Sequence, residues 1–445
     1  MNRKPVVAIV GRPNVGKSAL FNDIAGSEIS IVDDRPGVTR DRIYADCTWL
    51  NYQFTLIDTG GIEPESTEVI PAQMREQAEI AIETADVIVL VVDGKTGLMD
   101  DDSRVMDILR RSKKPVVLCV NKIDNYKKEQ NAIYEFYSLG TGDPFPVSAA
   151  NRQGLGELLD EICAHFPENL GQEEDDDRPR IAIVGRPNVG KSSIVNRLVG
   201  ENRVIVSDIA GTTRDAIDTP FTRNGQEYVL IDTAGLRRKS RISENIERFS
   251  IIRTVTAVDR ADVVVLVIDA TAGVTEQDAK IAGIAHDRGK GILIAVNKWD
   301  AYAEKDDKSV YKFSEEVRRT LSYLDYADII FISAKTGQRM DRMFDEIDRI
   351  IQSANLRVGT GVLNEVLARA LTAQQPPSDK GHRLRVYYMT QVSVKPPTFA
   401  VFVNDKELMH FSYTRYLENQ IREAFGFRGT PLRFLIRERR GEEET

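Results

Sequence analysis

The chain shows the same pattern of apolar and polar positions in two successive halves. Short runs rich in Val and Ile, apolar at nearly every position, alternate with longer stretches of helical periodicity. Such runs are typical of strands buried on both faces, because a half-exposed strand alternates apolar with polar residues. Each half is therefore predicted to be an α/β domain, a mainly parallel sheet with helices on both faces. The predicted strands are residues 6–10, 54–57, 87–92 and 116–120, then 181–184, 228–231, 263–268 and 292–296.

The pattern changes near residue 355. A helical stretch at 362–371 precedes two strand-like runs, 384–394 and 398–403, which are followed by a helix at 413–425 and a strand at 432–436. This order predicts a small α+β domain of two helices and three strands.

An exact internal repeat explains the shared pattern. The motif GRPNVGKS occupies residues 11–18 and recurs unchanged at 185–192, while NKID at 121–124 recurs as NKWD at 297–300. Solenoid repeats span only about 20–50 residues, so this long period indicates duplication of a whole domain. The expected organisation is a first domain (1–168), an acidic linker (169–179), a second domain (180–354), a third domain (355–438) and a charged tail (439–445). The linker fits a solvated tether better than a docking peptide.

GRPNVGKS has the form of a phosphate-binding loop. It directly follows a predicted strand and precedes a helix, the context in which backbone N–H groups and the helix N-terminus surround a phosphate. In such a loop Lys17 or Lys191 reaches the β- and γ-phosphates, and the hydroxyl of Ser18 or Ser192 can ligate Mg²⁺. Two copies in the same context predict two nucleotide sites.

The NKxD motifs indicate which base is bound. Each follows a predicted strand and ends in a carboxylate, Asp124 or Asp300. A carboxylate can accept hydrogen bonds from both N1–H and the 2-amino group of guanine, a pair of donors that adenine lacks. The Ser-Ala pairs at 148–149 and 333–334 fit a loop whose backbone N–H contacts the base oxygen. The predicted base is guanine.

Two further motifs indicate a nucleotide-dependent switch. An Asp at the end of a strand, in DTGG (58–61) and DTAG (232–235), can hold Mg²⁺ through a water, and the following glycine leaves its N–H for the γ-phosphate. A Thr hydroxyl at equal distance from each phosphate loop can complete the coordination only with a triphosphate. The expected metal ligands are Ser18, Thr39, Asp58, Ser192, Thr213 and Asp232.

The candidate GTP-binding residues fall into two matching sets. In the first domain they are Gly11, Arg12, Pro13, Asn14, Val15, Gly16, Lys17, Ser18, Asp58, Thr59, Gly60, Gly61, Ile62, Asn121, Lys122, Ile123, Asp124, Ser148 and Ala149. In the second they are Gly185, Arg186, Pro187, Asn188, Val189, Gly190, Lys191, Ser192, Asp232, Thr233, Ala234, Gly235, Leu236, Asn297, Lys298, Trp299, Asp300, Ser333 and Ala334.

In this order the motifs resemble those of the translation-factor-type GTPases. The tandem pair followed by a small α+β domain resembles the bacterial double GTPases, the Der or EngA family, over essentially the whole chain. The resemblance implies Mg²⁺-dependent hydrolysis of GTP to GDP and phosphate by a switch that acts in assembly of the large (50S) ribosomal subunit, with that subunit and its rRNA as partners. The alternative is an RNA-assembly scaffold in which one domain holds nucleotide structurally and turnover is incidental. A metabolic kinase is disfavoured by the guanine motifs.

The residues after the Asp motif raise a question about catalysis. Ras-like GTPases place there a Gln that positions water, whereas this chain has Ile62 and Leu236. The resemblance implies a potassium ion held by a loop asparagine; the alternatives are that Asn merely tolerates the backbone angles of the loop, or that Arg40 and Arg214 act as internal arginine fingers. The expected catalytic residues are Lys17, Lys191, Asn14, Asn188, Thr39 and Thr213.

Charge indicates a role for the third domain. The whole chain has a net charge of −8, but residues 356–440 contain 14 Lys or Arg against 7 Asp or Glu, which predicts contact with phosphate. The resemblance makes this domain KH-like. Its GFRG sequence (426–429) reads like the RNA clamp of KH domains, but it lies between a helix and a strand instead of between two helices, so we expect a structural turn. The candidate phosphate contacts are Arg383, Arg385, Lys395, Arg415, Arg422, Arg428 and Arg433; the aromatics Tyr387, Tyr388, Phe399 and Phe402 are expected in the core more than in base stacking.

Composition bounds the remaining possibilities. The chain has 445 residues, is 42% apolar and 29% charged, and contains no run of 18 apolar residues and no secretory signal pattern. We therefore expect a cytoplasmic monomer with no stable membrane association and no DNA partner. The scattered Cys47, Cys119 and Cys163 are expected to be reduced and structural.

Overall fold

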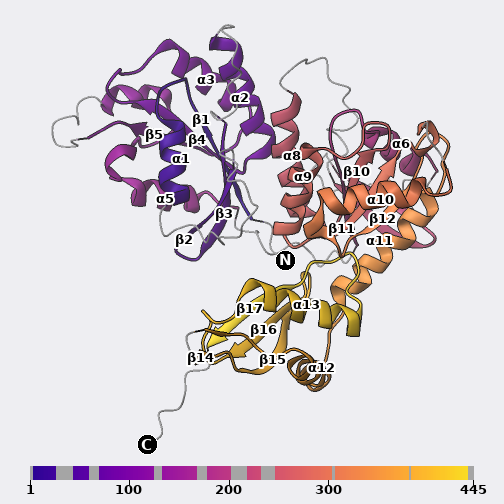
Figure 1. Ribbon diagram of the computed structural model, residues 1–445. Helices are drawn as coiled ribbons and strands as arrows, with labels where there is room; N and C mark the ends of the chain where they lie inside the picture. The colour runs from indigo at the N-terminus through magenta and orange to yellow at the C-terminus, as the bar shows by residue number, and fades with distance from the viewer. Residues whose placement is uncertain are drawn as a thin grey trace, which may run out of the picture. The chain divides into compact units, whose positions relative to one another are not determined.

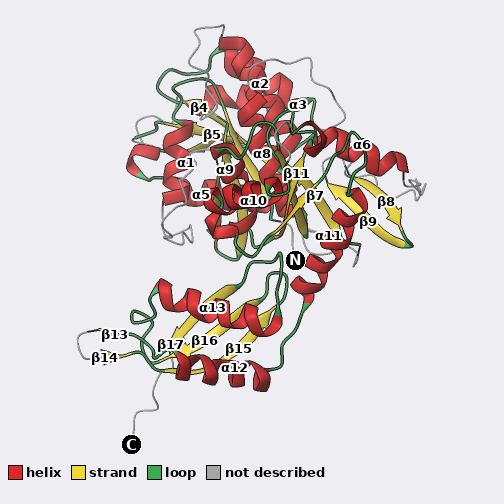
Figure 2. Ribbon diagram, turned by 45° about the vertical axis from the view of Figure 1, so that its right-hand side comes forward, coloured by secondary structure: helices red, strands yellow, loops and turns green. Residues whose placement is uncertain are grey.

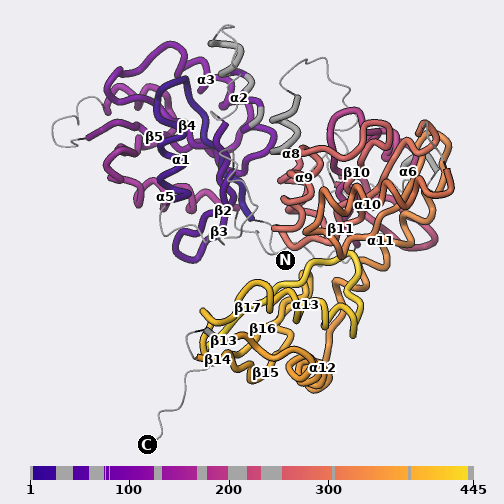
Figure 3. Tube along the Cα trace, viewed as in Figure 1, coloured from indigo at the N-terminus to yellow at the C-terminus, as the bar shows by residue number. Residues whose placement is uncertain are grey.

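The computed structural model describes residues 4–26, 44–59, 70–124, 133–167, 178–201, 218–231, 246–302, 306–379 and 382–438. The chain divides into two compact units, Met1–Asp176 with Ile242–Thr256 and Asp177–Arg241 with Ala257–Thr445. Figure 3 follows the chain through both units. Among the described residues, no helix is both long enough and apolar enough to cross a membrane.

The first domain is built on a six-stranded sheet with the order β2-β3-β1-β4-β5-β6. All pairs are parallel except β2 with β3. Its elements are β1 (Val6–Val10), α1 (Lys17–Gly26), β2 (Tyr44–Trp49), β3 (Tyr52–Asp58), α2 (Ile70–Thr84), β4 (Val87–Asp93), α3 (Asp100–Arg110), β5 (Val116–Asn121), β6 (Phe145–Pro146) and α5 (Leu155–Ala164).

The two faces of this sheet bury separate apolar cores. Along β1 the side chains alternate: Val6, Ala8 and Val10 join the core beneath α2 and α3, whereas Val7 and Ile9 join the core beneath α1 and α5. This is the alternation that a strand covered on both faces requires. Figure 1 shows the strands passing between these helices, and the predicted α/β architecture is confirmed.

The second domain repeats the same strand order, β8-β9-β7-β10-β11-β12, again with one antiparallel edge strand, β8. Neither β2 nor β8 was predicted, because these edge strands carry many polar residues and lack the long apolar run of a central strand. The elements are β7 (Arg180–Val184), α6 (Lys191–Glu201), β8 (Thr219–Arg223), β9 (Gln226–Ile231), α8 (Ile246–Arg260), β10 (Val263–Asp269), α9 (Glu276–Asp287), β11 (Gly291–Asn297), α10 (Ser309–Thr320), β12 (Asp328–Phe331) and α11 (Met340–Asn355).

The third domain has the predicted order of two helices and three strands. Both helices pack on one face of a sheet in which β15 and β16 are antiparallel and β16 and β17 are parallel (Figure 2). A short hairpin, β13 (Ser378–Asp379) with β14 (His382–Arg383), is added before the sheet. The other elements are α12 (Thr360–Ala373), β15 (Val386–Ser393), β16 (Thr398–Val403), α13 (Phe411–Phe425) and β17 (Arg433–Glu438).

The GFRG sequence joins the third domain to the second. The backbone N–H of Gly429 donates to the carbonyl of Tyr326 at 2.9 Å, and the N–H of Ile292 donates to the carbonyl of Gly429 at 2.7 Å. Beside them the Arg428 guanidinium lies 3.0 Å from Asp328 Oδ1. These contacts support the interpretation of this sequence as a structural turn and give it a role in holding two domains together.

Several arginines expected to contact RNA phosphate are instead engaged within the protein. Arg415 pairs with Asp325 at 3.2 Å, and Arg433 donates to the carbonyl of Asp287 at 2.7 Å, both in the second domain. Arg422 pairs with Glu418 at 2.7 Å and donates to the carbonyls of Phe427 and Thr430. These arginines therefore have partners within the protein, which net charge alone could not reveal, and their contact with phosphate stays a prediction.

The four aromatic residues of the third domain differ in burial. Phe399 is buried in the core, whereas Tyr387 and Tyr388 are exposed and Tyr388 stacks on Phe402 with ring centroids 4.2 Å apart.

The three cysteines are free thiols with buried side chains, and burial raises the pKa of Cys47 and of Cys163 to about 12. A thiol with so high a pKa stays protonated and unreactive, which agrees with a structural role.

Candidate nucleotide sites

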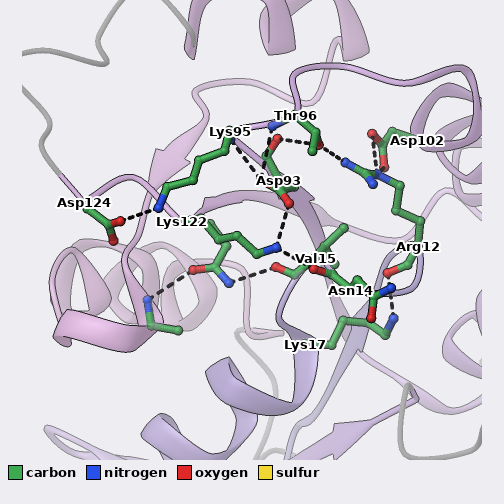
Figure 4. A network of polar contacts seen from close by, with 12 residues as sticks. Arg12, Asn14, Val15, Lys17, Asp93, Lys95, Thr96, Asp102, Lys122 and Asp124 are labelled. Carbon is green, nitrogen blue, oxygen red and sulfur yellow. Dashed lines mark hydrogen bonds and ion pairs between the residues drawn. The ribbon is translucent and has the colours of Figure 1, made fainter.

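The sheet brings the predicted motifs together at one edge of each domain. The carboxyl ends of parallel strands meet at the same edge, so the loop after β1, Asp58 at the end of β3 and the NKxD motif after β5 converge. Figure 4 shows this edge of the first domain, where the phosphate loop, the end of β4 and the NKxD motif form one polar network. The second domain repeats the arrangement after β7 and β11.

The loop lysines lie inside the curve of their own loops. Lys17 Nζ donates to the carbonyls of Gly11 and Arg12 at 2.8 and 2.9 Å, and its side chain is buried. Lys191 Nζ makes the equivalent bonds, both 2.6 Å long, and burial lowers the pKa of Lys191 to about 8. Both ammonium groups are therefore held where loops of this kind bind nucleotide phosphates.

The loop backbone explains why asparagine follows proline in both copies. Asn14 and Asn188 have φ values of 66° and 64°, in the left-handed region that Asn tolerates better than most residues. Both side chains are exposed. This backbone conformation is by itself sufficient to explain the asparagine. The binding of potassium by Asn14 and Asn188 therefore stays a prediction.

The asparagine of each NKxD motif is a brace within the protein. Asn121 Nδ2 donates to the carbonyl of Val15 at 2.9 Å, and Asn121 Oδ1 accepts from the N–H of Ala149 at 3.1 Å. Asn297 makes the matching bonds in the second domain, of 2.8 and 2.9 Å. These side chains were predicted to bind nucleotide; the structure shows that they tie the phosphate loop to the Ser-Ala loop.

The lysine of each NKxD motif is also engaged. Lys122 Nζ donates to the carbonyl of Asn14 at 2.6 Å and pairs with Asp93 Oδ2 at 2.7 Å, and Lys298 pairs with Asp269 at 2.5 Å. Burial alone would raise the pKa of Asp93, but the hydrogen bond from Lys122 and two backbone N–H groups hold it below its usual value. Neither aspartate was predicted as a site residue, although each ends an apolar strand and the two are related by the internal repeat.

A second pair of missed aspartates holds the loop arginines. Arg12 Nε lies 3.3 Å from Asp102, and Arg186 Nε lies 3.1 Å from Asp278; both carboxylates are fully buried. Each aspartate also caps its helix, because Asp102 Oδ2 accepts from the N–H of Met99 at 3.2 Å. The arginine side chains therefore anchor the phosphate loop to α3 and α9.

The guanine-reading carboxylates are placed by serine. Ser148 Oγ donates to Asp124 Oδ1 at 2.8 Å, and Ser333 Oγ donates to Asp300 Oδ1 at 2.6 Å. In the first domain Asn151 Nδ2 adds a contact of 3.1 Å to the same oxygen. Each carboxylate thus lies against its own Ser-Ala loop.

Ser18 and Asp58 come together in the first domain. Ser18 Oγ donates to Asp58 Oδ2 at 2.7 Å, which places two oxygen donors side by side beside the phosphate loop. Such hard oxygen donors are those that Mg²⁺ prefers, so this part of the predicted metal set fits the ion. Thr59, predicted to bind nucleotide, directs its hydroxyl to the carbonyl of Ile9 at 2.5 Å.

Four predicted site residues have buried side chains. The side chains of Val15, Val189, Ile123 and Trp299 are buried in the apolar core, so they cannot contact nucleotide. The remaining predictions lie outside the described residues: Thr39, Arg40, Gly60, Gly61, Ile62, Thr213, Arg214, Asp232, Thr233, Ala234, Gly235 and Leu236, with most of the acidic linker and the tail.

A lysine-bearing loop between a strand and a helix, tied by hydrogen bonds to the asparagine of an NKxD motif, defines a P-loop GTPase domain, and this chain has two. The family described as "50S ribosome-binding GTPase" matches residues 6–122 and 180–298, and "KH-domain-like of EngA bacterial GTPase enzymes, C-terminal" matches 357–437. The chain belongs to the GTPase Der family, and it is a GTPase with a KH-like third domain.

The family likeness extends over the full length. The chain is 66% identical to GTPase Der of Lachnospira eligens over 440 residues, 99% of this chain and 100% of that protein, and 69% identical to GTPase Der of Lachnoclostridium phytofermentans over 437 residues, 98% and 99%. Among solved structures it is similar to Era in complex with MgGDPNP and nucleotides 1506–1542 of 16S ribosomal RNA. That likeness, 21% identity over 73% of this chain and 99% of that one, has a TM-score of 0.32, which is too low to bear on function.

Proposed function

We propose that the protein is a GTP-hydrolysing switch in assembly of the large (50S) ribosomal subunit, working as a cytoplasmic monomer. The observation that carries the proposal is that both GTPase domains keep a braced phosphate loop with a buried or half-buried lysine, in a chain that also bears a KH-like domain. Two braced phosphate loops in one chain favour two working switches over a single structural nucleotide.

Hydrolysis would proceed by in-line attack of water on the γ-phosphate. Lys17 and Lys191 would place positive charge at the β- and γ-phosphate oxygens, where negative charge accumulates in the transition state. Ser18 and Asp58, and in the second domain Ser192 and Asp232, would hold Mg²⁺, which when bound neutralises phosphate charge. The braces described above keep each loop in position before the nucleotide arrives.

The second catalytic charge is proposed to be potassium. Asn14 and Asn188 are exposed on the phosphate loops, and an ion held there would supply the charge that an arginine finger supplies in other GTPases. GTP turnover in KCl and in NaCl at equal ionic strength, each with and without 50S subunits, tests this directly. Faster turnover in KCl than in NaCl without subunits supports the proposal. Turnover that depends only on added subunits, and not on K⁺, refutes it.

Comparison of Lys17→Ala with Lys191→Ala separates the switch from the scaffold. Each substitution removes one loop ammonium and should lower turnover at its own site. If one variant keeps the full turnover of the parent protein, the site altered in that variant is structural, and the scaffold interpretation is correct.

The ribosomal partner is proposed to contact the KH-like domain. Arg437 is exposed and pairs in the sheet with Phe402, which in turn pairs with the exposed Tyr388. Arg385 is exposed directly before β15, and each phosphate contact should steepen the salt dependence of binding. Sedimentation of the protein with 50S subunits across a KCl series should show weaker binding and a shallower slope for Arg385→Ala with Arg437→Ala. Arg415→Ala is the control, because Arg415 pairs with Asp325 within the protein.

A further inference from the structure

One difference between the two nucleotide sites lies in the turn beside the guanine-reading carboxylate. Strand β4 ends in Asp93 and is followed by Gly94 and Lys95; strand β10 ends in Asp269 and is followed by Ala270 and Thr271. The turn itself is the same, since the backbone N–H groups of Lys95 and Thr271 both donate to the strand-ending aspartate at 2.9 Å.

These side chains point to different partners. Thr271 Oγ1 turns back to Asp269 Oδ1 at 2.7 Å, whereas Lys95 extends across the site and its Nζ lies 2.5 Å from Asp124 Oδ2 (Figure 4). The other oxygen of Asp124 accepts from Ser148 and Asn151. In the first domain, protein donors thus engage both oxygens of the carboxylate that reads guanine.

We propose that Lys95 is a specificity-determining residue of the first site, which competes with guanine for Asp124 and so lowers the affinity of that site for guanine nucleotides. The inference rests on the proposed reading of guanine by Asp124. Guanine presents two donors to the carboxylate, N1–H and the 2-amino group, and the Lys95 ammonium on Oδ2 competes with one of them for that oxygen. The second domain has threonine at this position and lacks that competitor.

The expected size of the effect follows from solvent exposure. The side chains of Lys95 and Asp124 are 54% and 38% exposed, and exposed ion pairs contribute little, so their loss should change affinity by about two- to fivefold. Salt weakens such a pair further, and the effect of Lys95 should diminish as ionic strength rises.

Binding of a fluorescent GDP analogue to the full-length protein tests the proposal. With the second site disabled by Lys191→Ala, Lys95→Thr should bind the analogue about two- to fivefold more tightly than the parent, and added NaCl at constant KCl should narrow the difference. With the first site disabled by Lys17→Ala, the reciprocal Thr271→Lys should weaken binding at the second site. Unchanged or weaker binding by Lys95→Thr overturns the proposal, the latter by showing that Lys95 contacts the nucleotide itself.

Competition with inosine diphosphate supplies a readout that a merely structural lysine would not change. Hypoxanthine lacks the 2-amino group and needs only one carboxylate oxygen, so Lys95→Thr should strengthen GDP binding more than inosine diphosphate binding. An equal gain for both nucleotides overturns the competition. Asp124→Ala distinguishes failure of the proposed function from failure of the Lys95 proposal. If Asp124→Ala leaves GDP binding unchanged, Asp124 does not read guanine, whatever the effect of Lys95→Thr.

Discussion

The side-chain amide of Asn121 donates a 2.9 Å hydrogen bond to the carbonyl of Val15, which fastens the guanine motif to the phosphate loop. The next residue, Gly16, has a φ of 94°, and a Cβ built on it would lie 2.3 Å from Asn121 Nδ2. Glycine is therefore required here for two reasons: it adopts the positive φ, and it lets the Asn121 amide approach the loop backbone closely. The second domain repeats the relation between Gly190 and Asn297, at 2.2 Å.

Gly16→Ala should weaken nucleotide binding at the first site by at least about tenfold, because it forces a strained φ and displaces the Asn121 amide. Titration with a fluorescent GDP analogue, with the second site disabled, measures the loss. Gly26→Ala is the control, since a Cβ at Gly26 in α1 meets no atom within 4 Å. Equal affinities for the two variants would show that the brace does not matter for binding.

Removing Arg12 should destabilise the first domain in a pH-dependent manner. Burial raises the pKa of Asp102, so the ionised carboxylate opposes folding, and Arg12 offsets part of that cost. A raised pKa in the folded state favours folding at low pH, and this contribution is lost as pH rises through that value. Arg12→Met should therefore cost about 1–3 kcal/mol near pH 7.5 and less near pH 5.

Calorimetric melting of Arg12→Met at both pH values checks this. The double variant Arg12→Met with Asp102→Asn should recover much of the stability at pH 7.5, because no charge then remains buried without a partner. An equal loss at pH 5 and pH 7.5, unrelieved by the second substitution, would mean that Arg12 acts through packing alone.

The Arg12–Asp102 pair also shows where prediction from sequence stops. Apolar runs place the central strands, and the repeated motifs locate both nucleotide sites, because these signals are local. Arg12 and Asp102 are 90 residues apart in sequence, and only the fold brings α3 against the phosphate loop. Sequence therefore predicted Arg12 as a ligand of the nucleotide and missed its buried partner.

The third domain shows the same limit for surfaces. Its order of elements and the turn at GFRG were predictable from periodicity and from the position of the motif. The use of Arg428 and Arg415 was not, because their partners Asp328 and Asp325 lie in a different domain. A count of basic residues measures how much phosphate a domain can bind, but it does not identify the side chains already engaged.

Nucleotide binding at the second site should be accompanied by proton uptake near pH 8. Burial lowers the pKa of Lys191 to about 8, so at that pH the side-chain amine is neutral in about half of the protein molecules. Phosphate favours the charged form, and binding should take up to about half a proton at pH 8 and almost none at pH 6.5. Affinity should fall correspondingly as pH rises through 8.

Calorimetric titration of GDP in two buffers of different ionisation enthalpy measures this uptake, in protein whose first site is disabled by Lys17→Ala. Lys191→Arg is the control, because arginine stays charged over this range and should abolish the uptake while keeping a cation in the loop. Identical proton uptake by both proteins would assign the proton to another group.

The junction between the second GTPase domain and the KH-like domain should be sensitive to one methyl group. Gly429 has a φ of 67°, and a Cβ there would lie 2.3 Å from Ile350 Cγ1 in α11. Gly429→Ala should therefore separate the domains at this contact and cost about 1–3 kcal/mol. Gly426→Ala provides the comparison: its φ is 90°, but its Cβ would meet no atom within 4 Å, so it carries the strain without the clash. Limited proteolysis between α11 and α12 should be faster for Gly429→Ala than for Gly426→Ala. Equal rates would show that backbone strain within the KH-like domain, and not its contact with Ile350, controls the junction.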